Sequence, residues 1–336
     1  MKTEHASKDV QLAEELAGAY GRLQAEVRKR IVGQEGVIEQ LMLCVLARGH
    51  GLLVGVPGLA KTMLVRTLAE SLELTFRRIQ FTPDLMPSDI LGTEVIQEDP
   101  ATRQRQFRFL PGPVFAHLVL ADEINRTPPK TQAALLETMQ ERQVSSGGTT
   151  HPLEEPFHVL ATQNPIEQEG TYPLPEAQLD RFLMEVRIGY PSPTEEVEIM
   201  ERHAGAAEDA VSPALSRADI LRYQELVRRV PIGRPVLEYA AALVRRTRPE
   251  DTDAPLFVRD NVSWGAGPRA SMHLVLAAKA RAILRGQYAA GWDDIAAVII
   301  PVLRHRLILN FAARSEGLTP DHLIERLLAD TPKMTN

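Results

Sequence analysis

The feature that most restricts how this chain can fold is an apolar stretch followed by a glycine-containing turn and a helical pattern, at residues 52–65 (LLVGVPGLAKTMLV). Such a strand–turn–helix directs backbone N–H groups at the helix N-terminus, where they can hold a phosphate. The turn differs by one residue from the pattern G-x-x-x-x-G-K-S/T, because Ala60 stands where a glycine is expected before Lys61. Taken alone, the stretch is compatible with either a phosphate-binding loop or an ordinary strand–turn–helix.

The backbone at Ala60 decides what this departure costs. Alanine costs nothing in helical dihedrals, whereas a left-handed conformation would cost about 1–2 kcal/mol. Because Ala60 directly precedes a helix, we expect helical dihedrals. Gly55 and Gly58 then allow a tight loop, Lys61 reaches the β- and γ-phosphates of a nucleotide, and the Thr62 hydroxyl ligates Mg²⁺.

The pattern along the chain changes near residue 190. Before it, short apolar runs bounded by Gly, Pro and Asp alternate with helical patterns, which is typical of buried parallel strands in an α/β sheet. After the Pro-rich step at 191–193, helical periodicity dominates. The strand runs are 51–55, 74–81, 116–123, 157–165 and 184–191, and the helical runs are 218–230, 235–248, 270–286 and 292–309. We therefore expect a helical segment over 1–30, an α/β core over 31–190 and an all-α domain over 191–330.

Two segments interrupt this alternation and have the pattern of β-hairpins. In 93–113, phenylalanines alternate with arginines after a turn at Asp99-Pro100, and in 142–160 a Gly147-Gly148 turn separates two short stretches. A lone hairpin would by default be a surface insertion. Two hairpins, each beside a strand that ends in candidate site residues, favour a surface that takes part in function.

Polar residues end two of the apolar runs. Asp122-Glu123 closes one run, and such a pair can hold Mg²⁺ with one carboxylate and activate an attacking water with the other. Asn164 closes the next run and would face the same γ-phosphate if the strands are parallel. The alternatives are an acidic pair that opens a helix and an asparagine that turns the chain before Pro165.

Two arginines are candidates for a phosphate contact. Arg181 alone would most simply be a surface ion-pair partner. Arg269 follows Pro268, which is well suited to open a helix, so its cation would oppose the helix dipole by about 0.3–1 kcal/mol. A bound anion nearby would reverse that sign, and we expect one.

Composition excludes several other classes. The formal net charge is −6, from 44 acidic and 38 basic residues, and no block of Lys and Arg is present, which disfavours nucleic acid as the main partner. The N-terminus has no secretory apolar region, and no apolar run approaches the roughly 20 residues of a membrane helix. We expect a cytoplasmic protein without membrane insertion, whose single cysteine, Cys44, is a buried thiol.

Together these motifs resemble the MoxR family of AAA+ ATPases, from about Ile31 to about residue 325. The resemblance rests on IVGQE, GVPGLAKT, LADEINRTPPKTQAALLETMQE, ATQNP, EGTYPLPEAQLDRF and GAGPRAS, in that order. With its alanine before the lysine, the loop of this chain resembles the form that the loop has in this family. The resemblance implies a P-loop NTPase fold, with a parallel sheet, hairpin insertions and a following all-α lid.

The resemblance also implies ATP and Mg²⁺ as cofactors and a role for each site residue. The adenine side is Val32, Gly33 and Gln34, and the phosphate loop is Gly55, Val56, Pro57, Gly58, Leu59, Ala60, Lys61, Thr62 and Met63. Thr62 and Asp122 hold Mg²⁺, Glu123 is the catalytic base, Asn164 is sensor 1 and Arg269 is sensor 2. Arg181 is the arginine finger, and Arg126 is a weaker interface candidate.

A finger that acts on a neighbouring subunit's nucleotide implies a homo-oligomeric ring, expected to be a hexamer. Because such a finger is worth about 10³–10⁵ in rate, the monomer should be nearly inactive. By resemblance, the hairpins project toward the central channel, and the ring remodels or matures client proteins, often by inserting metals or cofactors. A partner with a von Willebrand factor A domain would be a separate chain. A nucleic-acid-stimulated motor, a non-hydrolysing nucleotide switch and a small-molecule kinase are the alternatives.

Overall fold

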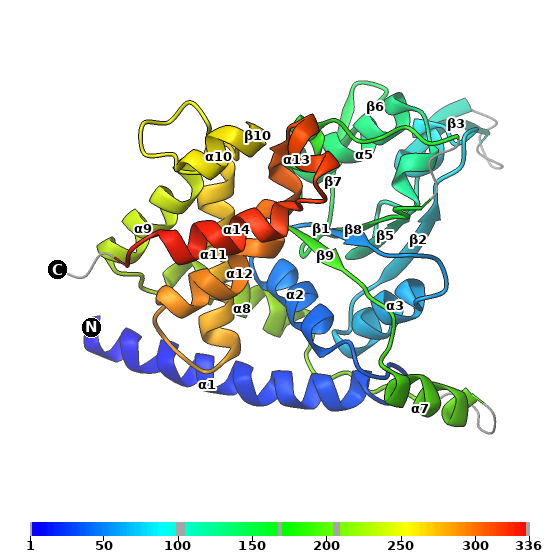
Figure 1. Ribbon diagram of the computed structural model, residues 1–336. Helices are drawn as coiled ribbons and strands as arrows, with labels where there is room; N and C mark the ends of the chain where they lie inside the picture. Colours follow the sequence, from blue (N-terminus) through cyan, green and yellow to red (C-terminus); the bar gives the residue numbers. More distant parts are fainter. Residues whose placement is uncertain (1, 99–104, 167–169, 204–208, 334–336) are drawn as a thin grey trace.

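The computed structural model describes residues 2–98, 105–166, 170–203 and 209–333. Its centre is a five-stranded parallel sheet in the order β2-β5-β8-β1-β9 (Figure 1). These strands coincide with the expected apolar runs: β1 Gly51–Val54, β2 Phe76–Gln80, β5 Leu118–Asp122, β8 His158–Gln163 and β9 Met184–Arg187. The expected parallel α/β sheet is therefore confirmed.

The three central strands, β5, β8 and β1, are buried on both faces, which explains why they are almost continuously apolar. Side chains alternate between two faces along a strand. Leu118 and Leu120 of β5 point into one hydrophobic cluster with α2 (Glu35–Leu46) and α3 (Lys61–Ser71). Val119 and Ala121 point into a second cluster with α5 (Pro129–Glu141).

The chain after residue 209 is a helical lid. Its helices are α8 Arg217–Arg229, α9 Arg234–Arg245, α10 Leu256–Asn261, α11 Pro268–Leu284, α12 Trp292–Leu303, α13 Phe311–Ser315 and α14 Pro320–Asp330. The long N-terminal helix α1 (Lys2–Val27) lies along the lid, where Asp9 forms an ion pair with Arg229 and accepts a hydrogen bond from Tyr288 (Figure 1). Helix α7 (Pro193–His203) connects core and lid. The division at residues 30 and 190 stays a prediction.

The helical pattern expected over 292–309 is wrong in its last residues, because α12 ends at Leu303. Pro301 has no N–H to donate back along the helix, which weakens its last turn. The chain then passes through a 3₁₀ turn, Arg304–Arg306, into β11 (Ile308–Leu309), which pairs with β10 (Val262–Trp264). The helical lid thus also carries a two-stranded antiparallel sheet.

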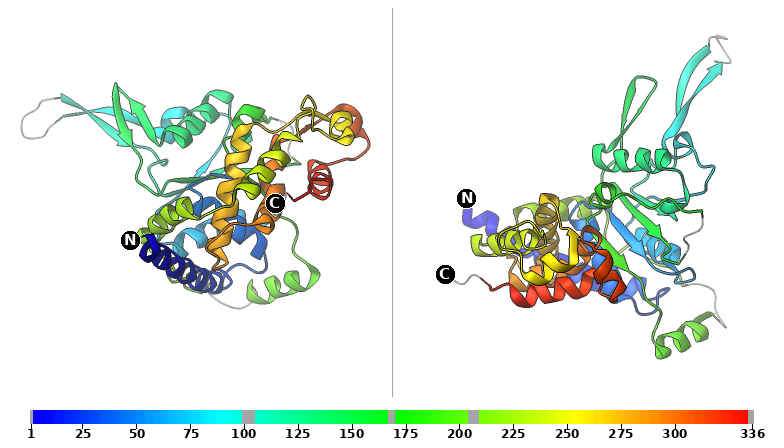
Figure 2. Two further views of the ribbon diagram at one scale, coloured as in Figure 1. Left: turned by 90° about the vertical axis from the view of Figure 1, so that its left-hand side faces the viewer. Right: turned by 45° about the horizontal axis from the view of Figure 1, so that its top comes forward.

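Both expected hairpins are present. Strand β3 (Gly92–Glu98), which follows the short α4 (Pro87–Leu91), pairs with β4 (Arg105–Pro111), and β6 (Gln143–Ser146) pairs with β7 (Thr149–Pro152). The expected Asp99-Pro100 turn lies outside the described residues. The hairpins project from the same side of the core (Figure 2), and the Phe109 ring stacks on His151 at 3.9 Å between centroids. They therefore form one joined projection.

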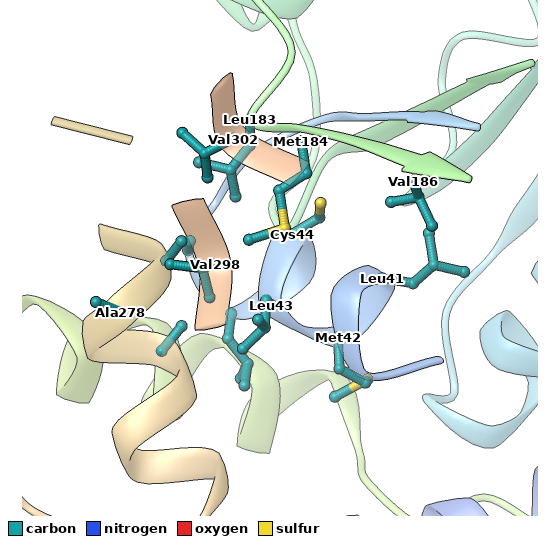
Figure 3. Packing of buried hydrophobic residues seen from close by; sticks show 14 of the residues in the cluster. Leu41, Met42, Leu43, Cys44, Leu183, Met184, Val186, Ala278, Val298 and Val302 are labelled. Carbon is teal, nitrogen blue, oxygen red and sulfur yellow. The ribbon is translucent and has the colours of Figure 1, made fainter. Parts of the chain in front are cut away.

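Cys44 is fully buried in the core cluster that joins sheet and lid. It lies among side chains from α2, β9, α11 and α12, including Met184, Ala278 and Val302 (Figure 3). Burial raises the pKa of this thiol to about 12, and the expectation of a buried thiol is confirmed. Within the described ranges, no helix has both the length and the apolar character needed to cross a membrane.

Candidate nucleotide site

Three of the expected chemical segments meet at one edge of the sheet. Because β1, β8 and β5 are parallel neighbours, the loop after Val54, the Asp122-Glu123 pair and Asn164 all follow the carboxyl ends of adjacent strands. The register pairs Val54 with Gln163, which directly precedes Asn164. In sheets of this kind ligands bind at this edge.

The two loop glycines serve different purposes. Gly58 has φ of +84°, and a Cβ added there would meet nothing within 4 Å, so its backbone conformation is what favours glycine. A Cβ at Gly55 would instead lie 2.8 Å from the Ile188 carbonyl oxygen. Gly55 therefore lets the start of the loop approach the chain that follows β9.

The expectation of helical dihedrals at Ala60 is wrong. Its φ of 53° and ψ of 24° are left-handed, although its carbonyl oxygen already accepts the first hydrogen bond of α3 from the Leu64 N–H at 2.9 Å. The physical reason is that Ala60 is the cap residue, which need not share the dihedrals of the helix that it opens. The alanine is thus tolerated at a cost of about 1–2 kcal/mol.

The Lys61 side chain folds back onto the start of the phosphate loop. Its Nζ donates to the carbonyl oxygens of Gly55 at 2.8 Å and Val56 at 2.7 Å. Burial lowers the pKa of Lys61, while the nearby carboxylates of Asp122 and Glu123 raise it. The ammonium group therefore lies between the loop and the acidic pair, where it can contact a phosphate.

Asp122 is buried, and both of its oxygens have partners. Its Oδ1 accepts a hydrogen bond from the Thr162 hydroxyl at 2.6 Å, and its Oδ2 lies 2.7 Å from Nη2 of Arg78. The Thr62 hydroxyl is 3.5 Å from Oδ2, so the two residues expected to hold Mg²⁺ are adjacent. Sequence reasoning missed Arg78 and Thr162; a polar residue inside an apolar strand run is the signal that could have found them.

Glu123 is held in place by its backbone and its carboxylate. Its φ is 57°, and its N–H donates to the Thr162 hydroxyl at 2.8 Å. Its Oε2 accepts from Gln80 at 2.8 Å and from Arg126 at 3.0 Å. Gln80 was also missed, although it pairs directly with Asp122 across β2 and β5. Arg126 was expected at an interface and contacts Glu123 within this chain.

Asn164 carries an unpaired amide. The residue is 6% exposed, and its Oδ1 accepts a hydrogen bond from the Ile166 N–H at 3.3 Å. Its Nδ2 has no hydrogen-bond partner among the described residues. A buried donor left unpaired costs about 1–3 kcal/mol. An oxygen atom of a ligand or of an attacking water would remove this cost.

A pocket of about 410 Å³ adjoins the loop and is lined by Gly55, Val56, Leu59, Gly189 and Tyr190, among others. Of the expected adenine-side residues, Gln34 contacts a residue that lines this pocket. Gln34 Nε2 lies 3.4 Å from the Gly189 carbonyl oxygen, and the space beside Gly33 is occupied by the Glu195 carboxylate. Val32 precedes them in the same turn. The adenine assignment stays a prediction.

Neither candidate arginine makes an ion pair or side-chain hydrogen bond with the phosphate loop among the described residues. Arg181 follows α6 (Glu176–Leu179), is half-buried, and makes no ion pair or side-chain hydrogen bond with any described residue. Arg269 lies in the first turn of α11, as expected from Pro268, with Nη1 at 3.6 Å from Asp180 Oδ2. Their catalytic roles stay predictions.

Known proteins share both parts of this architecture. Residues 50–184 match the ATPase family associated with various cellular activities (AAA), and residues 256–327 match an AAA lid domain. The chain is 46% identical over 303 residues to the chaperone MoxR1 of Mycobacterium tuberculosis, covering 90% of this chain and 79% of the relative. The chain belongs to the MoxR family of AAA+ ATPases.

Further relatives support this MoxR assignment over nearly the whole chain. The protein MoxR of Paracoccus denitrificans is 33% identical over 324 residues, which cover 90% of this chain and 92% of the relative. A crystal structure from Cytophaga hutchinsonii, of a protein assigned as an ATPase, has a TM-score of 0.90 and 40% identity, with both chains fully covered. The family and fold expected from the sequence are therefore confirmed.

Proposed function

We propose that this MoxR protein is a Mg²⁺-dependent ATPase whose subunits complete one another's sites in a ring, and that hydrolysis remodels or matures a client protein. The hydrolytic part rests on the buried amide of Asn164, which follows β8 next to β5 and β1 and has no hydrogen-bond partner in the part of the chain that the structure describes. Because most buried polar groups are hydrogen-bonded, this amide donor is available to a water or phosphate oxygen.

The residues present fit ATP and Mg²⁺. Backbone N–H groups at the start of α3 and the ammonium group of Lys61 suit phosphate oxygens. The Thr62 hydroxyl and the Asp122 carboxylate supply the oxygen ligands that Mg²⁺ prefers. Bound there, Mg²⁺ would neutralise charge on the phosphates.

The chain's own residues would arrange the attack of water. Gln80 and Arg126 both donate to Oε2 of Glu123, which leaves Oε1 to accept a proton from the water. The Asn164 amide would orient that water from the end of the neighbouring strand. The guanidinium of Arg181, which has no partner among the described residues, would stabilise transition-state charge at the nucleotide of an adjacent subunit. This is why a ring, expected to be a hexamer, is part of the proposal.

The client is proposed to be a protein. MoxR1, the relative from M. tuberculosis, is named a chaperone. The β3–β4 hairpin of this chain presents Ile96 and Phe107, which are 62% and 74% exposed and directly opposite each other in register. Exposed apolar pairs of this kind suit protein contacts. Maturation by metal or cofactor insertion, with a separate von Willebrand factor A domain partner, is the specific form of the proposal.

Glu123→Gln tests the catalytic part, with Glu137→Gln, at an exposed position of α5, as the matched control. Losing the base should reduce phosphate release by about 10²–10⁴-fold. Binding of a fluorescent ATP analogue should be kept. Unchanged hydrolysis in Glu123→Gln would rule out the assigned base. Full turnover by a chain that stays monomeric in light scattering would rule out the ring.

The same variant tests the client part. Loaded with ATP and magnesium, Glu123→Gln should retain clients and adaptors that wild type releases. Lys61→Ala, which should not bind ATP, is the control. Equal recovery of proteins with both variants would contradict ATP-dependent client binding.

A further inference from the structure

The guanidinium of Arg306 is buried at the contact between the lid and the core. Arg306 ends the 3₁₀ turn after α12 and is 5% exposed. Burial lowers its pKa to about 10, with hydrogen bonding to Asp180 acting in the opposite direction. Because an unpaired buried cation is strongly unfavourable, its donors must find acceptors.

Those acceptors lie mostly on one short segment of the core. Arg306 Nε donates to Asp180 Oδ1 at 2.8 Å, and Nη2 donates to the carbonyl oxygens of Asp180 at 3.0 Å and Phe182 at 2.6 Å. Nη1 lies 3.4 Å from the Leu183 carbonyl oxygen and also donates to Val302 of the lid. One side chain thus holds the backbone on both sides of Arg181.

Arg181 itself depends on this support. Its side chain has no ion pair or hydrogen bond within the described chain, so its direction is set by the backbone that carries it. A second lid cation, Arg269, lies 3.6 Å from the same Asp180 carboxylate. Two lid arginines therefore contact Asp180, the residue directly before Arg181.

We propose that Arg306 is a positioning residue for Arg181: it holds the backbone of residues 180–183 so that one subunit's arginine meets the nucleotide of the next. This inference rests on the proposed hydrolysis across a subunit boundary. If so, the position of Arg181 depends on how the lid of the same subunit packs against its core. A displacement of about 1 Å can reduce a rate by about 10²-fold.

Arg306→Lys removes the planar set of donors and keeps a positive charge. We expect steady-state ATP hydrolysis to fall by about 10²-fold, with nucleotide affinity unchanged. Arg304→Lys is the matched control, because Arg304 lies in the same turn but pairs with Asp321 of the lid at 3.0 Å. Its hydrolysis should stay close to wild type. Equal losses in both variants would contradict the inference.

Mixed rings distinguish a positioning role from a merely structural one. Glu123→Gln subunits lack the base but keep a correctly held Arg181, and Arg306→Lys subunits keep the base. Mixing these two inactive proteins should restore hydrolysis, whereas mixing Arg306→Lys with Arg181→Ala should not. If Arg306 only maintains folding or its own subunit's nucleotide site, the first mixture stays inactive and the inference is overturned.

A mixture of Glu123→Gln with Arg181→Ala separates this inference from the proposed function. If that mixture stays inactive, completion across subunits is wrong. If it recovers while Glu123→Gln with Arg306→Lys does not, only the role of Arg306 is wrong. Should Arg306→Lys fail to fold, Asp180→Asn replaces it, since it removes the carboxylate but keeps the backbone acceptors; it should recover in the same mixture, and failure to recover would overturn the inference.

Discussion

A single substitution at Ala60 tests most directly whether the phosphate loop has a strained, left-handed backbone. The residue precedes Lys61 and has left-handed dihedrals, φ 53° and ψ 24°. Alanine is strained in this region because its Cβ approaches the following carbonyl oxygen, whereas glycine is not. Ala60→Gly should therefore stabilise the protein, although replacing alanine with glycine usually destabilises.

Two opposing terms set the size of the effect. Relief of the left-handed strain is worth about 1–2 kcal/mol. The greater freedom of glycine in the unfolded chain costs about 0.4–1 kcal/mol. The difference is a gain between about 0 and 1.6 kcal/mol, centred on about 0.8 kcal/mol, which for a chain of this size raises the melting temperature by about 1 °C.

Urea and thermal unfolding, followed by circular dichroism, provide the assay. Ala133→Gly is the control, since Ala133 is exposed inside the helix α5, where glycine should cost about 1 kcal/mol. Binding of a fluorescent ATP analogue should be unchanged in Ala60→Gly, because the N–H of residue 60 is kept. If both variants lose stability by similar amounts, the left-handed strain at residue 60 does not exist and the reasoning is refuted.

Three further predictions concern buried groups. Asn164→Ala should lower phosphate release by about 10²-fold without changing ATP affinity, because the amide orients water rather than binding nucleotide; tighter or weaker ATP binding with unchanged turnover would contradict this. Burial lowers the pKa of His50 to about 3 and of His158 to about 4, so their stabilising effect is present above about pH 6.5 and is lost as pH falls toward those values. Urea titrations should show the free energy of unfolding falling by about 2–3 kcal/mol per pH unit between about pH 6 and pH 4, and a flat profile would be evidence that His50 and His158 are not held neutral in the folded protein. Cys44, fully buried and with its pKa raised to about 12, should react with a thiol reagent only after unfolding, so rapid modification of the native protein would disprove the packing around it.

The residues that could be predicted from the sequence share one property: each follows the end of an apolar run. Asp122, Glu123 and Asn164 stand where a buried strand gives way to polar residues, and parallel strands bring their carboxyl ends together. The loop at 55–60 is marked in the same way by its glycines and by Lys61. Both hairpins were visible from their alternation and turn residues.

What could not be predicted depends on contacts between distant segments or on a backbone angle. Arg78 reaches Asp122 from a neighbouring strand, and Arg306 reaches Asp180 from the lid, across 126 positions of sequence. Arg78 stands inside a strand run, but nothing in that run indicates its partner, and the local pattern around Arg306 does not distinguish it from a solvent-exposed cation. The left-handed Ala60 was missed for another reason: it directly precedes a helix, and its place next to the helix was taken to imply helical dihedrals, whereas a cap residue need not have them.

These missed contacts have a common consequence for how the site works. Glu123 is held by a residue of β2, and the segment before Arg181 is held by the lid, so neither group is set by its own element alone. The lid makes a further contact with the sheet through Asp321, which lies 3.2 Å from Arg187 at the end of β9. Arg187 also lines the pocket beside the phosphate loop. A movement of the lid would therefore act on the pocket beside the phosphate loop and on Arg181 together, and in the proposed ring that would connect the state of one site to the next.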